Sequence, residues 1–191
     1  MTKKCVKYLA VGVIAFGVMI FSLLGQNTNT AINQSVIPKE NWKKFTSAEG
    51  GFSICFPGTP EHTNYVVKTK DGDCKIFREI VPVDPGMEFS VQCADYLGNS
   101  NQISSKQQFA AARAALVTHP AWKLEYEGDF TLGTHPGKDF IFSAGEDSKI
   151  MGRMRIVCGK KYVYQTLVVF HKGHFRKEIK KFIDSFSIEE K

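Results

Sequence analysis

Histidine is the residue type in this chain most suited to binding a metal ion, and two histidines lie close together. His171 and His174 are three residues apart, where a predicted strand leads into a predicted helix. Gly173 lies between them, so the two rings need not converge, and a zinc site requires at least a third protein ligand. His119 and His135 each precede a proline in predicted turns. We therefore interpret these histidines as exposed turn residues and predict no metal ion and no cofactor.

The sequence offers no motif for nucleophilic catalysis or for nucleotide binding. It contains no G-x-S-x-G elbow, no recognisable catalytic cysteine motif, no G-x-G-x-x-G and no P-loop. Acidic residues cluster at Glu146-Asp147 and at Glu125 and Glu127, but glycosidase carboxylates cannot be paired from sequence, and solvated charges explain these clusters better. We assign no catalytic residue. The enzymatic alternative is a hydrolase that combines histidine and acidic side chains from different strands.

Four cysteines follow the N-terminal segment, namely Cys55, Cys74, Cys93 and Cys158. An even number permits two disulfides with three connectivities, and the lack of C-x-x-C argues against zinc or a redox pair. If residues 73–82 and 87–96 form a hairpin, facing residue numbers sum to about 169. Cys74 and Cys93 sum to 167, so this hairpin would bring them within bridging range. The alternative is that all four are reduced and buried in strands.

Basic side chains cluster in and just before the last predicted helix: Lys172, Arg176, Lys177, Lys180 and Lys181. This face could contact anionic lipid head groups, where each basic residue contributes on the order of 1 kcal/mol. Glu178, Glu189 and Glu190 dilute the charge, and a charged outer helix face is ordinary. Both interpretations stay open.

The first 25 residues combine a positive flank with a continuous apolar run. Lys3, Lys4 and Lys7 precede residues 8–24, which carry no charge, and a polar cluster follows. This order is typical of an export signal or a membrane anchor. The run of 17 residues reaches the lower limit for spanning a bilayer and exceeds the usual core of a signal peptide.

We predict that residues 1–25 form a signal-anchor rather than a cleaved signal peptide, because neither Gly25 nor Ala31 completes a small-residue cleavage site. Residues 26–41 are rich in Asn, Thr, Gln and Ser and predict a flexible linker. The positive-inside rule then places the rest of the chain outside the cytoplasm. The expected location is the inner membrane, facing the periplasm or extracytoplasmic space, or the secreted fraction if the segment is cleaved.

The charge balance argues against nucleic acid as a partner. The formal net charge is +6, but without the three leader lysines 22 basic residues face 19 acidic ones, which leaves about +3. The basic residues also lack the aromatic interleaving of a nucleic-acid interface. Residues 42–191 are enough for a single domain that buries roughly 68–70% of its unfolded surface.

Residue patterning predicts an α+β domain with a mostly antiparallel meander sheet covered by two helices. The expected strands are residues 52–56, 62–69, 74–81, 88–96, 122–132, 137–143, 150–158 and 162–170. A helix begins at Ser104 or Ser105, since Ser105 and Gln108 have the spacing of a capping box, and Pro120 ends it. A second helix is expected over residues 173–186.

Three short segments resemble parts of small exported bacterial proteins of unknown function. They are residues 42–60 (WKKFTSAEGGFSICFPGTP), the hairpin residues 153–167 and the closing residues 182–186 (FIDSF). That group is similar in layout to the PsbP-like α/β/α sandwich, which Mog-type binding proteins share. The resemblance implies a non-catalytic accessory or binding module and transfers no catalytic residues. The four cysteines and the long anchor depart from the pattern of the group.

The sequence therefore predicts an exported, membrane-tethered binding module without enzymatic activity. Its unknown protein or small ligand would engage the loops or a groove between sheet and helix, and the N-terminal helix would contact the membrane. The hydrolase described above and a structural envelope component are the alternatives. An exposed aromatic cluster would favour the binding module.

Overall fold

The computed structural model describes residues 42–69, 72–84, 87–96, 104–144, 149–174 and 176–189. The predicted anchor of residues 1–25, and the linker up to residue 41, lie outside these ranges. Within them the helices are α2 (Ser105–Thr118) and α3 (Arg176–Asp184). Neither is both long and apolar enough to span a bilayer.

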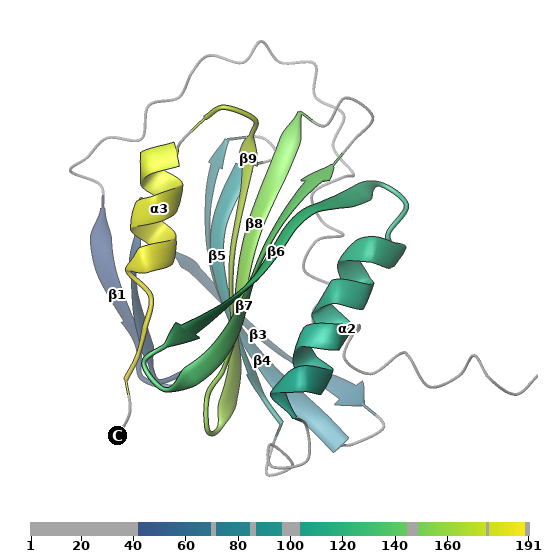
Figure 1. Ribbon diagram of the computed structural model, residues 1–191. Helices are drawn as coiled ribbons and strands as arrows, with labels where there is room; N and C mark the ends of the chain where they lie inside the picture. Colours follow the sequence, from purple (N-terminus) through teal and green to yellow (C-terminus); the bar gives the residue numbers. More distant parts are fainter. Residues whose placement is uncertain are drawn as a thin grey trace, which may run out of the picture.

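Two antiparallel sheets form the frame of the molecule (Figure 1). The larger has the order β3-β4-β5-β9-β8-β7-β6, which joins the meander β3-β4-β5 to the meander β6-β7-β8-β9 through the β5–β9 pair. Its strands are β3 (Glu61–Thr69), β4 (Gly72–Asp84), β5 (Met87–Asp95), β6 (Trp122–Leu132), β7 (His135–Ala144), β8 (Ile150–Cys158) and β9 (Tyr162–His171). The smaller, in the order β1-β2-β10, contains β1 (Lys43–Ser47), β2 (Phe52–Phe56) and β10 (Ser187–Ile188).

The antiparallel sheet with two helices confirms the expected α+β class, and each expected strand is present with small shifts at its ends. The sequence analysis missed β1 and β10. The last helix also ends at Asp184 rather than at residue 186, because the chain turns at Ser185 and enters β10. The Ser185 hydroxyl accepts a hydrogen bond from the backbone N–H of Cys55, which holds this turn against β2.

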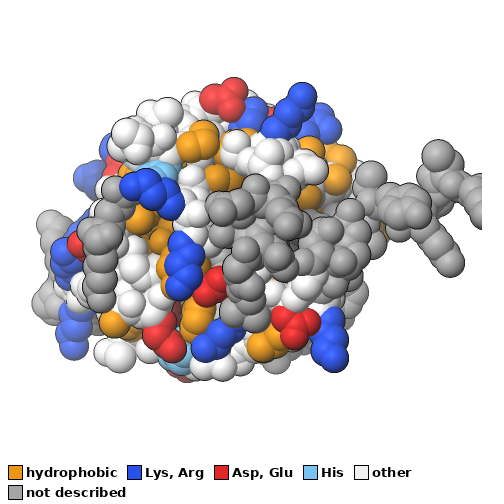
Figure 2. Space-filling model, turned by 90° about the horizontal axis from the view of Figure 1, so that it is seen from below, with side chains coloured by type: hydrophobic (Ala, Val, Ile, Leu, Met, Phe, Trp, Pro, Cys, Tyr) orange, Lys and Arg blue, Asp and Glu red, His pale blue; other side chains and the backbone are white. Residues whose placement is uncertain are grey.

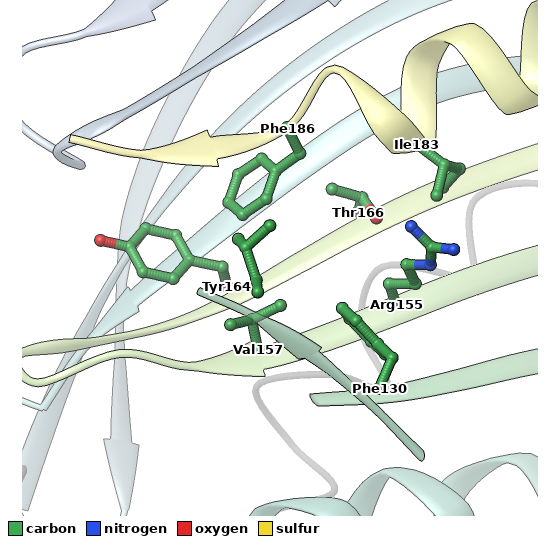
Figure 3. A pocket seen from close by; sticks show the side chains of 8 residues that line it. Phe130, Arg155, Val157, Tyr164, Thr166, Ile183 and Phe186 are labelled. Carbon is green, nitrogen blue, oxygen red and sulfur yellow. The ribbon is translucent and has the colours of Figure 1, made fainter. Parts of the chain in front are cut away.

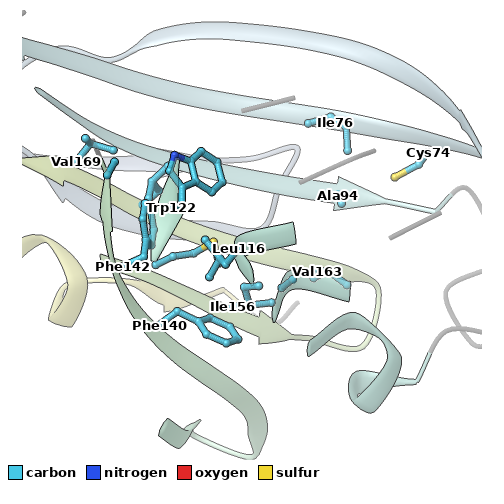
Figure 4. Close-up of a cluster of buried hydrophobic side chains, with 14 of the residues drawn as sticks. Cys74, Ile76, Ala94, Leu116, Trp122, Phe140, Phe142, Ile156, Val163 and Val169 are labelled. Atoms are coloured by element: carbon cyan, nitrogen blue, oxygen red, sulfur yellow. The ribbon is translucent and has the colours of Figure 1, made fainter. Parts of the chain in front are cut away.

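The two helices lie on opposite faces of the larger sheet (Figure 1). Ala112 and Leu116 of α2 pack into one core with Phe140 and Phe142 of β7 (Figure 4). The other core contains side chains of α3, β2 and the facing strands, including Phe52, Phe56, Phe89, Ile179 and Phe182. The sheet is therefore the middle layer, with α2 on one side and α3 with the small sheet on the other.

The register between β4 and β5 separates the two cysteines for which the sequence analysis considered a disulfide. Phe77 faces Cys93, so facing residue numbers sum to 170. Cys74 is three residues from Phe77, and its side chain therefore points to the opposite face of the sheet. Cys74 packs in the α2 core and Cys93 in the α3 core. Of the two alternatives that the sequence left open, the structure does not contain the Cys74–Cys93 disulfide, and Cys55 and Cys158 are free thiols as well.

The capping box of α2 lies one residue earlier than predicted. The Gln107 N–H donates to the Ser104 hydroxyl at 3.3 Å, and the Ser104 N–H donates to the Gln107 side-chain oxygen at 2.9 Å. Gln108 instead points into the core, where its amide donates to the Tyr96 hydroxyl at 3.0 Å. Because Gln108 is buried, it does not take part in the cap, and α2 turns the side of Gln108, Ala112 and Leu116 toward the core.

Candidate functional site

The face of the larger sheet that carries α3 is only partly covered over β6, β7 and β8. Alternate residues of these strands point to this face, and the register aligns them in rows across the sheet. One row runs from Tyr126 through Ile141 to Arg153. The Tyr126 side chain is 52% exposed, although large aromatic residues are usually buried. Leu124 packs toward the α2 core, and in a regular strand Tyr126 would point to the same side. A bulge between the two residues turns Tyr126 to the opposite face, which carries α3.

An open groove of about 560 Å³ lies between α3 and these strands. We call it the α3 groove. Its lining combines half-exposed apolar side chains with charged ones: Ile141, Met151, Arg153, Arg155, Phe170, Lys172, Gly173, His174, Ile179, Lys180 and Asp184. The groove lies between sheet and helix, which is one of the two positions, with the loops, that the sequence analysis considered for a ligand.

A buried carboxylate fixes the two arginines of the α3 groove. Asp139 is 6% exposed and accepts hydrogen bonds from the Arg153 Nε at 3.1 Å and from an Arg153 terminal nitrogen at 2.7 Å. Its Oδ2 also accepts from the Arg155 Nε at 2.8 Å. The hydrogen bonds that Arg153 donates to Asp139 raise the pKa of Arg153, as expected for a paired guanidinium. The bidentate Arg153–Asp139 pair and the single Arg155–Asp139 hydrogen bond hold these side chains in one orientation before any ligand binds.

Arg155 also contacts two groups nearer to the surface. Its guanidinium lies 4.8 Å from the centre of the Phe130 ring, a cation–π arrangement. Its terminal nitrogen donates to Asp184 of α3 at 3.3 Å, and Asp184 also pairs with Lys180. Burial raises the pKa of Asp184, but the two cationic partners outweigh burial and leave the pKa below its ordinary value. Asp184 is therefore ionised at neutral pH.

A small cavity of about 10 Å³ adjoins the α3 groove at Arg155. Figure 3 shows the side chains around it, with Phe130 and Val157 facing Ile183 and Phe186 across Thr166. The Thr166 hydroxyl is buried without a hydrogen-bond partner. The space is comparable to one water molecule, so this cavity is an apolar closure of the groove rather than a ligand site.

A second groove of about 290 Å³ lies at the end of the molecule where the β6–β7 and β8–β9 turns meet β10. Its lining includes His135, Lys160, Lys161, Tyr162 and Glu189. Figure 2 shows this end of the molecule, with basic and acidic side chains interspersed among small apolar areas. Tyr164 lines its floor and donates a hydrogen bond to the Gly50 carbonyl at 2.9 Å. This groove lacks the paired arginines of the first.

The structure separates the basic residues that were considered for contact with anionic lipid. Lys172 and Lys180 line the α3 groove. Lys181 instead places its ammonium 4.5 Å from the centre of the Trp42 ring, and Lys177 is exposed. The side chain of Arg176 lies outside the described part of the structure. Contact of these residues with anionic lipid stays a prediction.

The histidines occupy separate places. The His171 and His174 rings are 6.1 Å apart between their centres, and His119 stacks on Trp122 at 4.1 Å. Among the described residues, no group of three His, Cys, Asp or Glu side chains is arranged to bind a metal ion. The sequence analysis missed a fifth histidine, His62, whose Nδ1 lies 2.6 Å from the buried Glu79 carboxylate.

The His62–Glu79 pair was accessible in principle from the strand register, since the two residues face each other between β3 and β4. Burial raises the pKa of Glu79, and the hydrogen bond from His62 opposes this effect. The pair does not line either groove or the small cavity at Arg155.

Sequence reasoning also missed Asp139 and its arginines, because they come from β7 and β8 and meet only in the folded sheet.

No family model matches the chain, and no curated protein matches it. Among solved structures, the cyanobacterial PsbP (CyanoP) of Synechocystis sp. PCC 6803 is similar, with 10% identity and a TM-score of 0.50, over 86% of this chain and 98% of CyanoP. At this identity the likeness shows the fold alone, and it supports the PsbP-like layout expected from the sequence.

Two further solved structures are similar over part of their own length. A Bacteroides thetaiotaomicron VPI-5482 protein has 13% identity and a TM-score of 0.49, over 79% of this chain and 50% of that protein. The T6SS immunity protein TplEi of Pseudomonas aeruginosa has 16% identity and a TM-score of 0.40, over 63% of this chain and 47% of TplEi. The chain thus spans about half the length of each.

Proposed function

We propose that this chain is a binding module without enzymatic activity and that it holds a partner protein in the α3 groove. The observation that carries this proposal is the composition of the groove, where half-exposed Met151 and Phe170 line the same space as the fixed pair Arg153 and Arg155. Exposed Tyr126 lies beside the groove, next to its lining residue Ile141. Aromatic residues, methionine and arginine are the side chains enriched in protein interfaces. Side chains that are already ordered lose less entropy on binding, which favours affinity.

We further propose that the module acts outside the cytoplasm, tethered by residues 1–25 through the linker 26–41. The lysine-flanked apolar run supports this location. A reporter enzyme that is active only in the cytoplasm, fused to the C-terminus of the full chain, should give no activity. Strong reporter activity would contradict both export and tethering.

Photocrosslinking in the producing cells tests the groove itself. Tyr126 in β6 and Val66 in β3 are similarly exposed, at 52% and 55%. Val66 is therefore a matched control position away from the groove. With p-benzoylphenylalanine at position 126, illumination should yield a discrete adduct with one protein, and the same substitution at position 66 should not. Adding Arg153→Glu should abolish the adduct. Equal adducts from both positions, or no adduct from position 126, would refute binding in the α3 groove.

The His62–Glu79 pair does not support the hydrolase alternative. The His62 ring pairs with a carboxylate, but Glu79 is only 3% exposed and the pair lies outside the grooves. A general base must lie within hydrogen-bond reach of the proton that it removes from a substrate. We therefore assign the His62–Glu79 pair to the stability of the β3–β4 hairpin.

A further inference from the structure

The charges that line the α3 groove are mostly positive. Arg153, Arg155, Lys172 and Lys180 line it against one lining carboxylate, Asp184. The buried Asp139 beneath the arginines neutralises one further charge, so a positive excess remains at the surface. Complementary charge selects partners and speeds their association. The groove therefore favours a negatively charged ligand.

The shape of the groove favours a protein segment over a membrane surface. The side chains of Arg153 and Arg155 are only 26% and 23% exposed, because they lie on the floor between α3 and the sheet. A bilayer cannot bend into such a groove, whereas a single extended chain can. The floor follows β8 from Met151 to Arg155, about 13 Å at the rise of a β-strand, which matches roughly four residues of extended peptide.

The two carboxylates bound to Arg155 differ in their surroundings. Asp139 is buried and also holds Arg153, so it belongs to the frame of the site. The Asp184 side chain is 41% exposed and reaches Arg155 from α3 at 3.3 Å. Asp184 lies at the C-terminal end of α3, where a negative charge interacts unfavourably with the helix dipole. The Asp184–Arg155 contact is thus a weak, accessible ion pair inside the groove.

We infer that the α3 groove binds an acidic segment of a partner protein and that a carboxylate of this segment displaces Asp184 from Arg155. This inference rests on the proposed binding function. Asp184 acts as an internal competitor: it forms an ion pair with Arg155 in the free protein and thereby lowers the affinity for acidic partners. Removing its charge should therefore strengthen the binding of an acidic ligand, although a contact of the free protein is lost.

The test measures fluorescence anisotropy of a labelled tetraglutamate peptide with the full chain in detergent micelles, and a tetraglutamine peptide serves as the uncharged control. Asp184→Asn should tighten tetraglutamate binding by about threefold, and Arg153→Ala should weaken it by about tenfold. Lys106→Ala, on the exposed side of α2, should change neither value. Asp184→Ser repeats the test with a second uncharged side chain, and circular dichroism verifies that each variant is folded.

Three outcomes would overturn the inference. Equal binding of the two peptides would exclude charge recognition, and weaker binding by both Asp184 variants would exclude competition. Retention on phosphatidylglycerol vesicles that depends on Lys177 and Lys181, without peptide binding, would assign the basic residues to lipid instead. If the photocrosslinked adduct at position 126 persists while the acidic peptide fails to bind, the proposed function stands and only this inference fails.

Discussion

Asp139 is the residue on which the α3 groove depends, because its one buried carboxylate orients both Arg153 and Arg155. We predict that Asp139→Asn lowers the free energy of unfolding by about 1–3 kcal/mol, since hydrogen bonds between charged groups are lost in a largely buried setting. Urea unfolding followed by circular dichroism measures this. Asp129→Asn is the control, because the Asp129 side chain is 81% exposed and pairs with Lys138 at the surface. Equal loss from both variants would contradict the structural role of Asp139.

The buried thiols should resist alkylation across the alkaline range. Burial raises the pKa of Cys74 and of Cys158 to about 12 and raises that of Cys93 further. Since the thiolate is the reactive form, raising the pH from 7.5 to 9.5 should leave Cys74 and Cys93 unmodified by iodoacetamide in the folded protein. Mass spectrometry of tryptic peptides measures the modification, with urea-unfolded protein as the reactive control. Rapid labelling of either thiol in folded protein would contradict the burial.

The two cysteines that the sequence analysis considered for a disulfide, Cys74 and Cys93, show how strongly side-chain placement depends on strand register. The strand and turn pattern predicted the β4–β5 hairpin correctly, but facing residues sum to 170 rather than to about 169. A shift of one residue exchanges the two faces of a strand, so Cys74 and Cys93 enter different cores. Register is usually read from an alternation of apolar and polar residues, but β5 is buried on both faces, so its pattern does not distinguish the two registers.

Helix α2 offers a direct comparison between the expected and the observed cap. Ser104 caps the helix and Ser105 is its first residue. Ser104→Ala should lower the free energy of unfolding by about 1 kcal/mol, because a backbone N–H loses its side-chain acceptor. Ser105→Ala should have a much smaller effect. Thermal unfolding measures both, and a larger effect at Ser105 would restore the cap expected from the sequence.

Packing between β7 and β8 requires a glycine at position 152. The Phe142 ring covers Gly152, and a Cβ there would lie 2.1 Å from the nearest ring carbon. We predict that Gly152→Ala lowers the free energy of unfolding by about 1–3 kcal/mol, the usual range for overpacking, because the ring must shift in the α2 core. Chemical denaturation measures the change. An unchanged unfolding midpoint would show that the ring moves freely.

At the level of elements, strands with regular alternation were predictable, including the five-residue β2, whereas β1 and β10 were missed. Strands β6 and β8 match their predicted bounds because each is bounded by turn residues and presents alternating side chains. β10 has two residues, too few for any periodic pattern, and it exists because the chain after α3 pairs with β2. The α3 groove could not be predicted from the sequence for the same reason. Its lining residues come from β7, β8, β9 and α3, and local sequence patterns do not show how α3 packs on these strands.

The whole molecule adds a property that no single element carries. Both helices are apolar on one side, so the sequence predicted that they cover the sheet but not which face each would cover. The structure places α2 over β6, β7 and β8 on one face and α3 with the small sheet on the other. Because α3 and the small sheet cover this face only in part, Tyr126 of β6 stays exposed, and Arg153 and Arg155 of β8 line the open α3 groove. The candidate site therefore exists because α3 and the small sheet leave part of this face of the larger sheet uncovered.

The proposed tether leads to a prediction about the complete chain. If residues 1–25 remain in the membrane and residues 26–41 form a flexible linker, a protease added outside intact spheroplasts should cut in the linker and release one fragment. The fragment should begin near residue 42 and resist further digestion, because exposed flexible segments are cleaved far faster than packed sheets. N-terminal sequencing and mass spectrometry define the fragment. Full protection until the spheroplasts are lysed would place the module inside the cell, where neither the tether nor an extracytoplasmic partner could apply.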